Sequence, residues 1–401
     1  MVRWPACALR VPCKPVKVAL VILHADPARG GAERYTVALA SDLAAAGVEV
    51  SVLASSFASI GSNIECVPIA AAAITRAGGY LAFLHSLQRA LLTARFDIVH
   101  AMLPVPRCDI YHPHAGIAAE TLFNGHLLHD SPAMRAAAWL GNRLNRRRRL
   151  YAAVERRLLA SASPPLVLCL SDYIRRMVLR HYDLPPHALP VLHNGVDLQK
   201  FNPHAPAPAG AAPPWPADFA RGGIVGLMVA QDFRRKGLAT AIEALAMAAD
   251  GQLRLVVVGR DDPAPYRRLA RRRGVEHRVF FAGAVSDARI CYRRADFLIL
   301  PTRHDPCSLV VLEALAMGLP VITTVFNGAG ELVTGGRHGF VLNDPADAHA
   351  LASAMRAMLD SAARHRMREA CLELRPALSQ QHHVESLLGI YRRVAAGDRS
   401  A

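Results

Sequence analysis

The sequence lacks three patterns, and each absence removes a class of structure or chemistry. No stretch of eighteen or more uncharged apolar residues occurs in the 401 residues, although 52% are hydrophobic, so no membrane-spanning helix is expected. The eight cysteines are scattered and form no Cys-x-x-Cys pair, which argues against a zinc site or a disulfide framework and favours a reducing cytosol. No Gly-x-Gly-x-x-Gly occurs, so dinucleotide binding is not supported.

Acidic residues are also scarce relative to basic ones. The chain has 47 Lys and Arg against 32 Asp and Glu, a net charge of +15, which predicts an acidic partner: a nucleotide, an anionic lipid or nucleic acid. Aromatic residues make up only 6% and do not interleave with the basic run, and no zinc-finger or RNA-recognition pattern occurs. We therefore expect no nucleic acid partner, and a nucleic-acid-binding protein remains an alternative on charge alone.

The order of apolar and polar segments predicts an α/β fold. Residues 16–23 form a near-continuous apolar strand, as in a sheet covered on both faces. A helix follows over about 32–46, ends at Gly47, and leads to a strand at 48–54, which predicts a parallel βαβ unit. Further strands are expected at 96–100, 108–111 and 166–170.

A segment rich in proline and alanine, 203–217, predicts a linker, and the βα alternation restarts after it. Strands are expected at 224–229, 253–258, 278–281, 297–300 and 319–323, with helices at 238–249, 264–273, 287–294 and 308–317. The prediction is two doubly wound, Rossmann-like domains, at 16–202 and 218–379. Residues 1–15 do not resemble a signal peptide and are expected to form a disordered arm.

Unusual residues follow two of the predicted strands. Gly30 and Gly31 stand between the first strand and the first helix, where free backbone amides suit a phosphate or a sugar hydroxyl. Arg235 and Lys236 follow the first strand of the second domain, where a planar fork beside a point charge suits a diphosphate. A tight turn and a solvated charge run are the respective structural alternatives.

The segment from Asp305 to Glu313 is the third such place. It runs from a predicted strand end into the start of a helix, with Asp305 ahead of the helix and Glu313 inside it among apolar neighbours. A buried carboxylate needs hydrogen-bond partners, and ribose hydroxyls provide them. A glutamate on the helix surface is the alternative.

These segments resemble glycosyltransferase family 4, retaining enzymes of the GT-B fold, in which two Rossmann-like domains face each other across a cleft. The resemblance covers about residues 16 to 360 and rests most specifically on DPCSLVVLEALAMGLPVI, with RRKGLATAIEAL, NGAGELVTGGRHGFVLNDPAD and GGAERYTVALASDLAAAGVEVSVLA. The N-terminal half is also similar to lipopolysaccharide-core glucosyltransferases. In such relatives the C-terminal tail, here 380–401, crosses back to the first domain.

The resemblance implies a role for each matching residue. Glu313 binds the ribose of the nucleotide, and Asp305, where the family usually has Glu, meets the donor sugar. Backbone amides of the helix start bind the distal phosphate, and Arg235 and Lys236 neutralise the leaving diphosphate. Gly30 and Gly31 face that phosphate or the acceptor. The amides belong to Ser308, Leu309 and Val310.

The implied reaction moves a hexose from a UDP- or GDP-type sugar to a glycan or lipid-linked acceptor, without a cofactor. No Asp-x-Asp occurs, so we expect catalysis without a metal, by a front-face route in which the donor phosphate takes the acceptor proton. His114 is the candidate catalytic residue, and His100 and His112 are weaker candidates. The shorter Asp305, and Gln231 where many members have Arg, leave a non-catalytic scaffold as an alternative. A sugar-nucleotide epimerase of the GT-B fold is a second enzyme alternative.

Two further regions have both a functional and a structural interpretation. Residues 139–160 carry seven Arg and an apolar stripe, which predicts one basic amphipathic helix on an anionic membrane surface, the inner face of the plasma membrane; an internal helix is the alternative. Glu331 either contacts the sugar or caps the next turn, and we favour the structural role. Asn194 and Gly195 are expected to form a structural turn.

Overall fold

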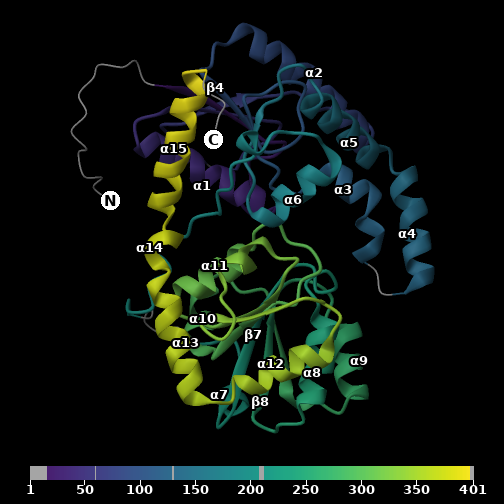
Figure 1. Cartoon of the computed structure of the whole chain (residues 1–401), viewed down its shortest axis with the longest axis vertical. Coiled ribbons are helices and arrows are strands. Elements are labelled where there is room, and N and C mark those ends of the chain that lie inside the picture. Colours follow the sequence, from purple (N-terminus) through teal and green to yellow (C-terminus); the bar gives the residue numbers. More distant parts are fainter. Residues whose placement is uncertain (1–15, 59, 129–130, 207–211, 398–401) are drawn as a thin grey trace. The chain divides into compact units, whose positions relative to one another are not determined.

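The computed structural model describes residues 16–58, 60–128, 131–206 and 212–397 (Figure 1). The predicted arm 1–15 and part of the predicted linker therefore lie outside the described residues. The chain divides into two compact units. The first contains the chain up to Leu170, residues 174–192 and the chain from Val384 onward, and the second contains residues 171–173 and 193–383.

The first unit is built on a parallel sheet of six strands in the order β3-β2-β1-β4-β5-β6. Its strands are β1 (Lys17–Val21), β2 (Glu49–Ala54), β3 (Glu65–Pro68), β4 (Ile98–Ala101), β5 (Ile110–Tyr111) and β6 (Leu166–Val167). Its helices are α1 (Gly31–Ala45), α2 (Arg76–Thr93), α3 (Ala118–Phe123), α4 (Pro132–Leu144) and α5 (Arg146–Leu159), with α6 (Asp172–His181) from residue 174 and α15 (Gln380–Ala395) from residue 384. Two short 3-10 turns are η1 (Gly125–Leu128) and η2 (Pro186–Ala188).

The second unit repeats this design with the order β12-β11-β10-β7-β8-β9, again all parallel. Its strands are β7 (Ile224–Val229), β8 (Leu253–Val258), β9 (Val279–Gly283), β10 (Phe297–Ile299), β11 (Val321–Thr324) and β12 (Gly339–Leu342). Its helices are α7 (Ala217–Ala220), α8 (Leu238–Ala248), α9 (Ala264–Arg272), α10 (Arg289–Arg294), α11 (Leu309–Ala316), α12 (Ala348–Ala357), α13 (Ser361–Glu373) and α14 (Arg375–Leu378), with η3 (Glu276–Arg278) and η4 (Gly328–Leu332).

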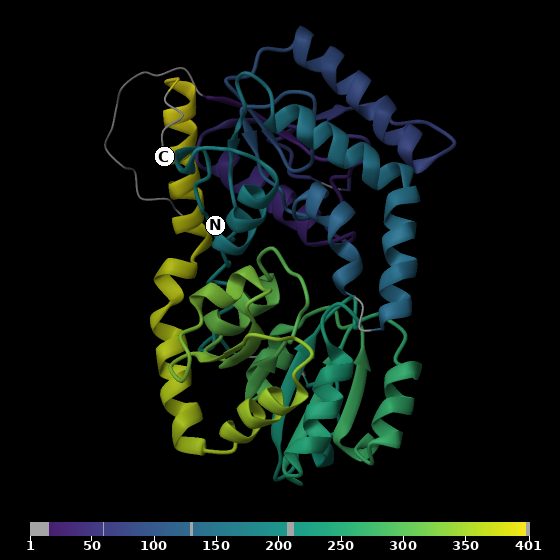
Figure 2. The same ribbon diagram turned by 45° about the vertical axis from the view of Figure 1, so that its right-hand side comes forward.

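Burial on both faces of each sheet explains the strand sequences. Residues 18–21 of β1 and 225–228 of β7 are fully or almost fully buried, as continuous apolar strands require when helices cover both faces. In the second unit α8 packs against α9 and α12, and α11 packs against α13 and α14 (Figures 1 and 2). Two α/β Rossmann-like units are therefore confirmed, as is the parallel pairing of β1 with β2.

Helix α15 completes the core of the first unit from the far end of the chain. Its apolar side chains pack with those of β1, β2, β4 and α1. The buried apolar residues of α15 are Val384, Leu387, Ile390, Tyr391 and Val394. The first unit therefore depends on a helix about 200 residues distant in sequence from the rest of its fold.

The single basic helix predicted over 139–160 is wrong. The structure has two helices there, α4 and α5, separated by Asn145, whose side chain accepts a hydrogen bond from the Arg148 amide at 3.1 Å and so caps α5. The apolar stripe divides with them: Leu144 on α4 is 68% exposed, whereas Leu158 on α5 is 3% exposed. An asparagine competes for backbone hydrogen bonds and thus ends one helix and starts the next.

Two smaller findings concern the predicted linker and membrane spans. Within 203–217, residues 207–211 are not described, and Trp215 is buried. Among the described residues, no helix is long and apolar enough to cross a membrane.

Candidate active site

The strand order places a candidate site at the carboxyl ends of β7 and β10. These strands are neighbours in the second sheet, and the order reverses between them. In open α/β sheets, ligands bind beyond the carboxyl ends of strands at such a reversal. Residues 230–237 follow β7 and residues 300–308 follow β10. These two loops carry Lys236 and Asp305.

Lys236 and Asp305 form a buried ion pair. Each residue is 8% exposed, and the Lys236 Nζ donates a hydrogen bond to Asp305 Oδ2. Burial alone would raise the pKa of Asp305, but the charge and hydrogen bond of Lys236, with Arg235 and His304, outweigh it and hold the pKa below its usual value. The sequence predicted separate ligand contacts for these residues, and the structure makes them partners of one another.

Arg235 joins the same two loops. Its Nη1 donates to the His304 carbonyl at 2.7 Å, and its Nε donates to Asp232 Oδ2 at 3.3 Å. The backbone takes part as well, because the Arg303 amide donates to the Arg235 carbonyl at 2.9 Å. Two cationic side chains from one loop are thus fixed against the loop that carries Asp305.

Helix α11 begins directly after the loop that carries Asp305. Ser308 is the N-cap residue, and its amide donates to Asn327 Oδ1 at 3.3 Å. The amides of Leu309 and Val310 belong to the first turn, where a helix has no internal acceptor for them and where its dipole favours an anion. Asn327 is 1% exposed and was not predicted as a site residue. The available signal in the sequence was an asparagine directly before Gly-Ala-Gly, a residue type that often caps a helix. In the structure Asn327 is the N-cap residue of η4.

Glu313 lies inside α11 and is buried, as its apolar neighbours predicted. It is 8% exposed, and its Oε2 accepts a hydrogen bond from the Tyr292 hydroxyl of α10 at 2.8 Å. The alternative of a glutamate on the helix surface is therefore wrong. Tyr292 is 21 residues distant, and no local pattern links it to Glu313.

In the first unit, Gly30 and His114 lie near the same end of α1. Gly30 is the N-cap residue of α1, and a side chain there would bring its Cβ within 2.8 Å of the Glu33 carboxylate. Gly31 is the first helical residue. The His114 ring lies 4.1 Å, centroid to centroid, from the ring of Tyr35 in α1. Gly30, Gly31 and His114 therefore belong to one region of the unit.

His100 and His112 form part of the core behind His114. Both are fully buried, and His100 Nε2 lies 3.1 Å from His112 Nδ1, while His100 Nδ1 lies 2.7 Å from the Tyr391 hydroxyl. The His112 and His114 rings are 4.1 Å apart. Since His114 is only partly buried, it is the histidine of this group with solvent access.

Glu331 has a structural role, but it caps a different element from the one expected. Its carboxylate accepts hydrogen bonds from the amides of Asp172 and Tyr173 at 2.8 and 2.6 Å, at the start of α6. Burial alone would raise the pKa of Glu331, but hydrogen bonds from His193 and these two amides hold it below its usual value. A carboxylate at this position stabilises a helix N-terminus.

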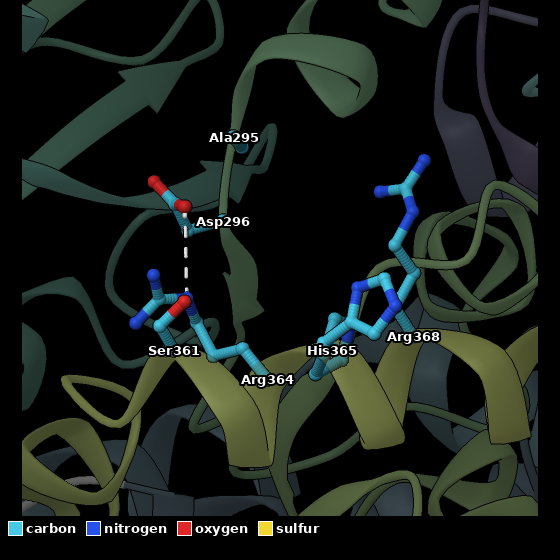
Figure 3. Close-up of a pocket in the computed structure, with 7 residues that line it drawn as sticks. Ala295, Asp296, Ser361, Arg364, His365 and Arg368 are labelled. Carbon is cyan, nitrogen blue, oxygen red and sulfur yellow. Dashed lines mark ion pairs between the residues drawn. The ribbon is translucent and has the colours of Figure 1, made fainter.

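A polar hollow lies at the opposite, amino edge of the second sheet (Figure 3). Asp296 and Pro320 immediately precede β10 and β11, and α13 provides the other wall. Arg364 pairs with Asp296 at 3.7 Å, and His365 Nε2 lies 3.3 Å from Glu369. Because these charges already have partners, the hollow is a weaker candidate than the loops around Asp305.

No group of three or more His, Cys, Asp or Glu among the described residues is arranged to hold a metal ion. The comparisons with known proteins concern both units. Residues 29–200 match the family model described as Glycosyltransferase Family 4, and residues 222–361 match that of Glycosyl transferases group 1.

One curated relative and two solved structures are similar along most of their length. The lipopolysaccharide glucosyltransferase WaaG of Escherichia coli (strain K12) is 26% identical over 321 residues, covering 79% of this chain and 82% of the relative. A crystal structure of WaaG, a glycosyltransferase involved in lipopolysaccharide biosynthesis, superposes with a TM-score of 0.74 at 24% identity, covering 93% of this chain and 99% of that one. Anabaena HepE in complex with UDP-glucose gives a TM-score of 0.66 at 17% identity, covering 93% and 99%.

Proposed function

Because the chain belongs to glycosyltransferase family 4, with the GT-B fold, we propose that it moves a hexose from a UDP- or GDP-type sugar to a glycan or lipid-linked acceptor. The proposal includes retention of the anomeric configuration and a place in lipopolysaccharide or exopolysaccharide assembly. The observation that carries it is the buried Lys236–Asp305 pair at the strand reversal, next in sequence to the start of α11 and to buried Glu313.

The second unit binds the donor in this proposal. Glu313 accepts hydrogen bonds from the ribose, because it is a buried carboxylate, which accepts hydrogen bonds from hydroxyl groups, as it does from the Tyr292 hydroxyl. The amides that begin α11 bind the distal phosphate, and Arg235 and Lys236 balance its charge. Asp305 contacts the sugar, and UDP-glucose in the complex of HepE is an example of such a donor.

Glycosyl transfer breaks the anomeric C–O bond while negative charge grows on the leaving diphosphate. We propose that Arg235, Lys236 and the α11 amides stabilise this charge without a metal ion. A donor phosphate oxygen takes the proton of the acceptor hydroxyl as the new C–O bond forms on the same face. His114, with Gly30 and Gly31, contacts the donor or acceptor from the first unit. A covalent glycosyl-enzyme detected by mass spectrometry would contradict the front-face route.

The direct test is sugar transfer from UDP-glucose and GDP-mannose to membrane glycolipid acceptors, followed by mass spectrometry. We expect transfer from one donor with an excess of EDTA present, because the proposed charge stabilisation comes from side chains and amides. Lys236→Ala should lower kcat by about 10²–10³-fold, the usual effect of losing one contact to transition-state charge. Lys200→Ala, an exposed lysine, is the matched control. Transfer that requires added Mn²⁺ or Mg²⁺ would contradict the metal-free mechanism.

We also propose that α4 and the start of α5 attach the protein to an anionic membrane, at the cytoplasmic face of the plasma membrane. Trp139, Leu140 and Leu144 of α4 are 41%, 53% and 68% exposed, and Arg143 lies over the Trp139 ring at 4.2 Å. Four consecutive arginines, 146–149, begin α5. Exposed apolar side chains beside arginines suit a negatively charged bilayer surface, where each arginine adds about 1 kcal/mol.

Vesicle co-sedimentation tests the membrane proposal. The protein should sediment with vesicles that contain phosphatidylglycerol and not with pure phosphatidylcholine, and the double variant Leu140→Ser/Leu144→Ser should reduce this binding about tenfold. Leu92→Ser in α2, a residue that is 81% exposed, is the control for loss of an exposed leucine. Equal binding to both kinds of vesicle would contradict the proposal.

A further inference from the structure

Two short segments of the second unit stand in the chain directly beside residues of the first. Residues 171–173 are flanked on both sides by residues of the first unit, and His193 and Asn194 follow Leu192 of the first unit. We call these residues, 171–173 and 193–194, the crossover segments. Both make hydrogen bonds to the loop 304–308, which carries Asp305.

The first crossover segment holds this loop at two points. The Ser171 hydroxyl donates to the Pro306 carbonyl at 2.7 Å, and the Tyr173 hydroxyl lies 2.8 Å from His304 Nδ1. Ser171 is fully buried, so its bond is shielded from water. Asp305 thus has anchored residues on both sides of it in the chain.

The second crossover segment holds the next carbonyl. Asn194 is 5% exposed, and its Nδ2 donates to the Cys307 carbonyl at 3.3 Å. Its Oδ1 is buried and has no hydrogen-bond partner among the described residues. A buried amide oxygen without a partner costs free energy, so the side chain of Asn194 contributes little net stability. Its bond to the loop is the contact that a smaller residue would lose.

The loop 304–308 is packed so closely against Ser171 that the two move together. The Asp305 amide donates to the Phe326 carbonyl, and the Gly328 amide donates to the Asp305 carbonyl, both at 2.9 Å. A Cβ on Gly328 would collide with the Ser171 side chain and with the Pro306 carbonyl. Ser171, Pro306 and Gly328 are therefore in close contact, and a shift of Ser171 displaces the loop.

We infer that Ser171 and Asn194 are positioning residues, which fix the loop 304–308 so that Asp305 and the start of α11 hold their geometry for the donor. The inference rests on the proposed function for its consequence in catalysis. Because both residues stand where the chain passes between units, displacement of either crossover segment is transmitted directly to this loop.

Amide hydrogen exchange tests the positioning role without any substrate. We expect peptides covering residues 303–310 to exchange at least tenfold faster in Ser171→Ala and Asn194→Ala, with the midpoint of thermal unfolding nearly unchanged for Asn194→Ala. Ser161→Ala is the matched control, since Ser161 makes the same kind of bond, to the Leu158 carbonyl at 2.8 Å, at the end of α5. Unchanged exchange in the loop would overturn the inference. Tyr173→Phe replaces Ser171→Ala if that variant does not fold.

Kinetic coupling tests the consequence for catalysis. With the donor that the enzyme uses, Ser171→Ala should lower kcat about tenfold, and it should lower it less than twofold when Asp305 is already Asn, because its effect acts through Asp305. Equal effects in both backgrounds would overturn the inference. If the wild-type protein transfers no sugar, the proposed function fails, and amide exchange still decides whether Ser171 and Asn194 position the loop.

Discussion

Buried ionisable side chains make the protein sensitive to acid at the scale of single residues. His383 is 2% exposed, and its Nδ1 donates to the His193 carbonyl at 2.7 Å. Burial lowers the pKa of His383 from its usual 6.5 to about 4, because the charged imidazolium loses its hydration. The folded protein therefore holds this histidine neutral at pH values where the unfolded chain protonates it.

The sign of the pH dependence follows from that difference. The contribution of neutral His383 to the unfolding free energy is complete above pH 6.5. It is lost as the pH falls toward 4, since the unfolded state then binds one more proton than the folded state. We expect His383 to account for a loss of about 3 kcal/mol in unfolding free energy between these values. The measurement is urea unfolding at several pH values, where His383→Gln should flatten the dependence. The exposed neighbour His382→Gln should leave it as in the wild type.

The sequence predicted single residues well where the signal was local. Glu313 stands among apolar neighbours in a helix, and its burial followed from that position alone. Hydrogen bonds between residues far apart in the chain were not predictable in the same way. The bond from Ser171 to Pro306 joins residues 135 apart, and that from Asn194 to Cys307 joins residues 113 apart. Such contacts depend on how the sheet is assembled, and no local pattern encodes them.

At the scale of elements, the turn before α8 places Lys236 against the β10 loop. Gly237 has a φ of +80°, and a Cβ at this position would collide with the Pro301 carbonyl. A left-handed residue with a side chain is strained by itself, and the collision adds to this cost. The close approach of these two backbones therefore requires glycine.

Gly237→Ala should accordingly destabilise the second unit by about 3 kcal/mol or more, through backbone strain plus overpacking. Gly274→Ala is the matched control, because Gly274 has a φ of +72° and open space around its Cβ position. It should cost about 1–2 kcal/mol, the strain alone. Chemical denaturation of the two variants provides the comparison. Equal losses would contradict the packing argument at Pro301.

Most elements were predicted because their periodicity is strong. The strands 224–229 and 253–258 were predicted with the bounds of β7 and β8, since each is rich in apolar residues and only Arg254 in the second is charged. The division between α4 and α5 was missed, because the arginines on both sides of Asn145 continue a helical pattern. Only the capping bond of Asn145 to the Arg148 amide interrupts it.

At the scale of the whole molecule, segments from the N-terminal and C-terminal parts of the chain pack together in the core of the first unit. Leu387 of α15 is fully buried in the core formed with β1, β2 and α1. The sequence of the tail alone did not predict this packing, and the expectation came from the resemblance to GT-B relatives. Contacts between residues this distant in the chain depend on topology, which the helix's own apolar face does not specify.

Leu387→Ala should therefore destabilise the first unit by about 2–5 kcal/mol, as expected for a leucine removed from a packed core. Amide exchange in β1 should become faster, while exchange in β7 of the second unit should not change. Leu92→Ala, at a residue that is 81% exposed, is the control and should leave both unaffected. Faster exchange in β7 alone would contradict the assignment of α15 to the first unit.

The measurement that tests the account most directly is calorimetric titration with UDP, GDP, ADP and CMP, on the wild type and on Glu313→Gln. We expect one nucleoside diphosphate to bind, and the variant to bind it about 10–100-fold more weakly, because the hydrogen bonds from the ribose to a charged acceptor become neutral ones. Tyr292→Phe, which removes one hydrogen bond within the protein to Glu313, should retain most of the affinity. The absence of binding by all four nucleotides to the wild type would contradict a donor site in the second unit.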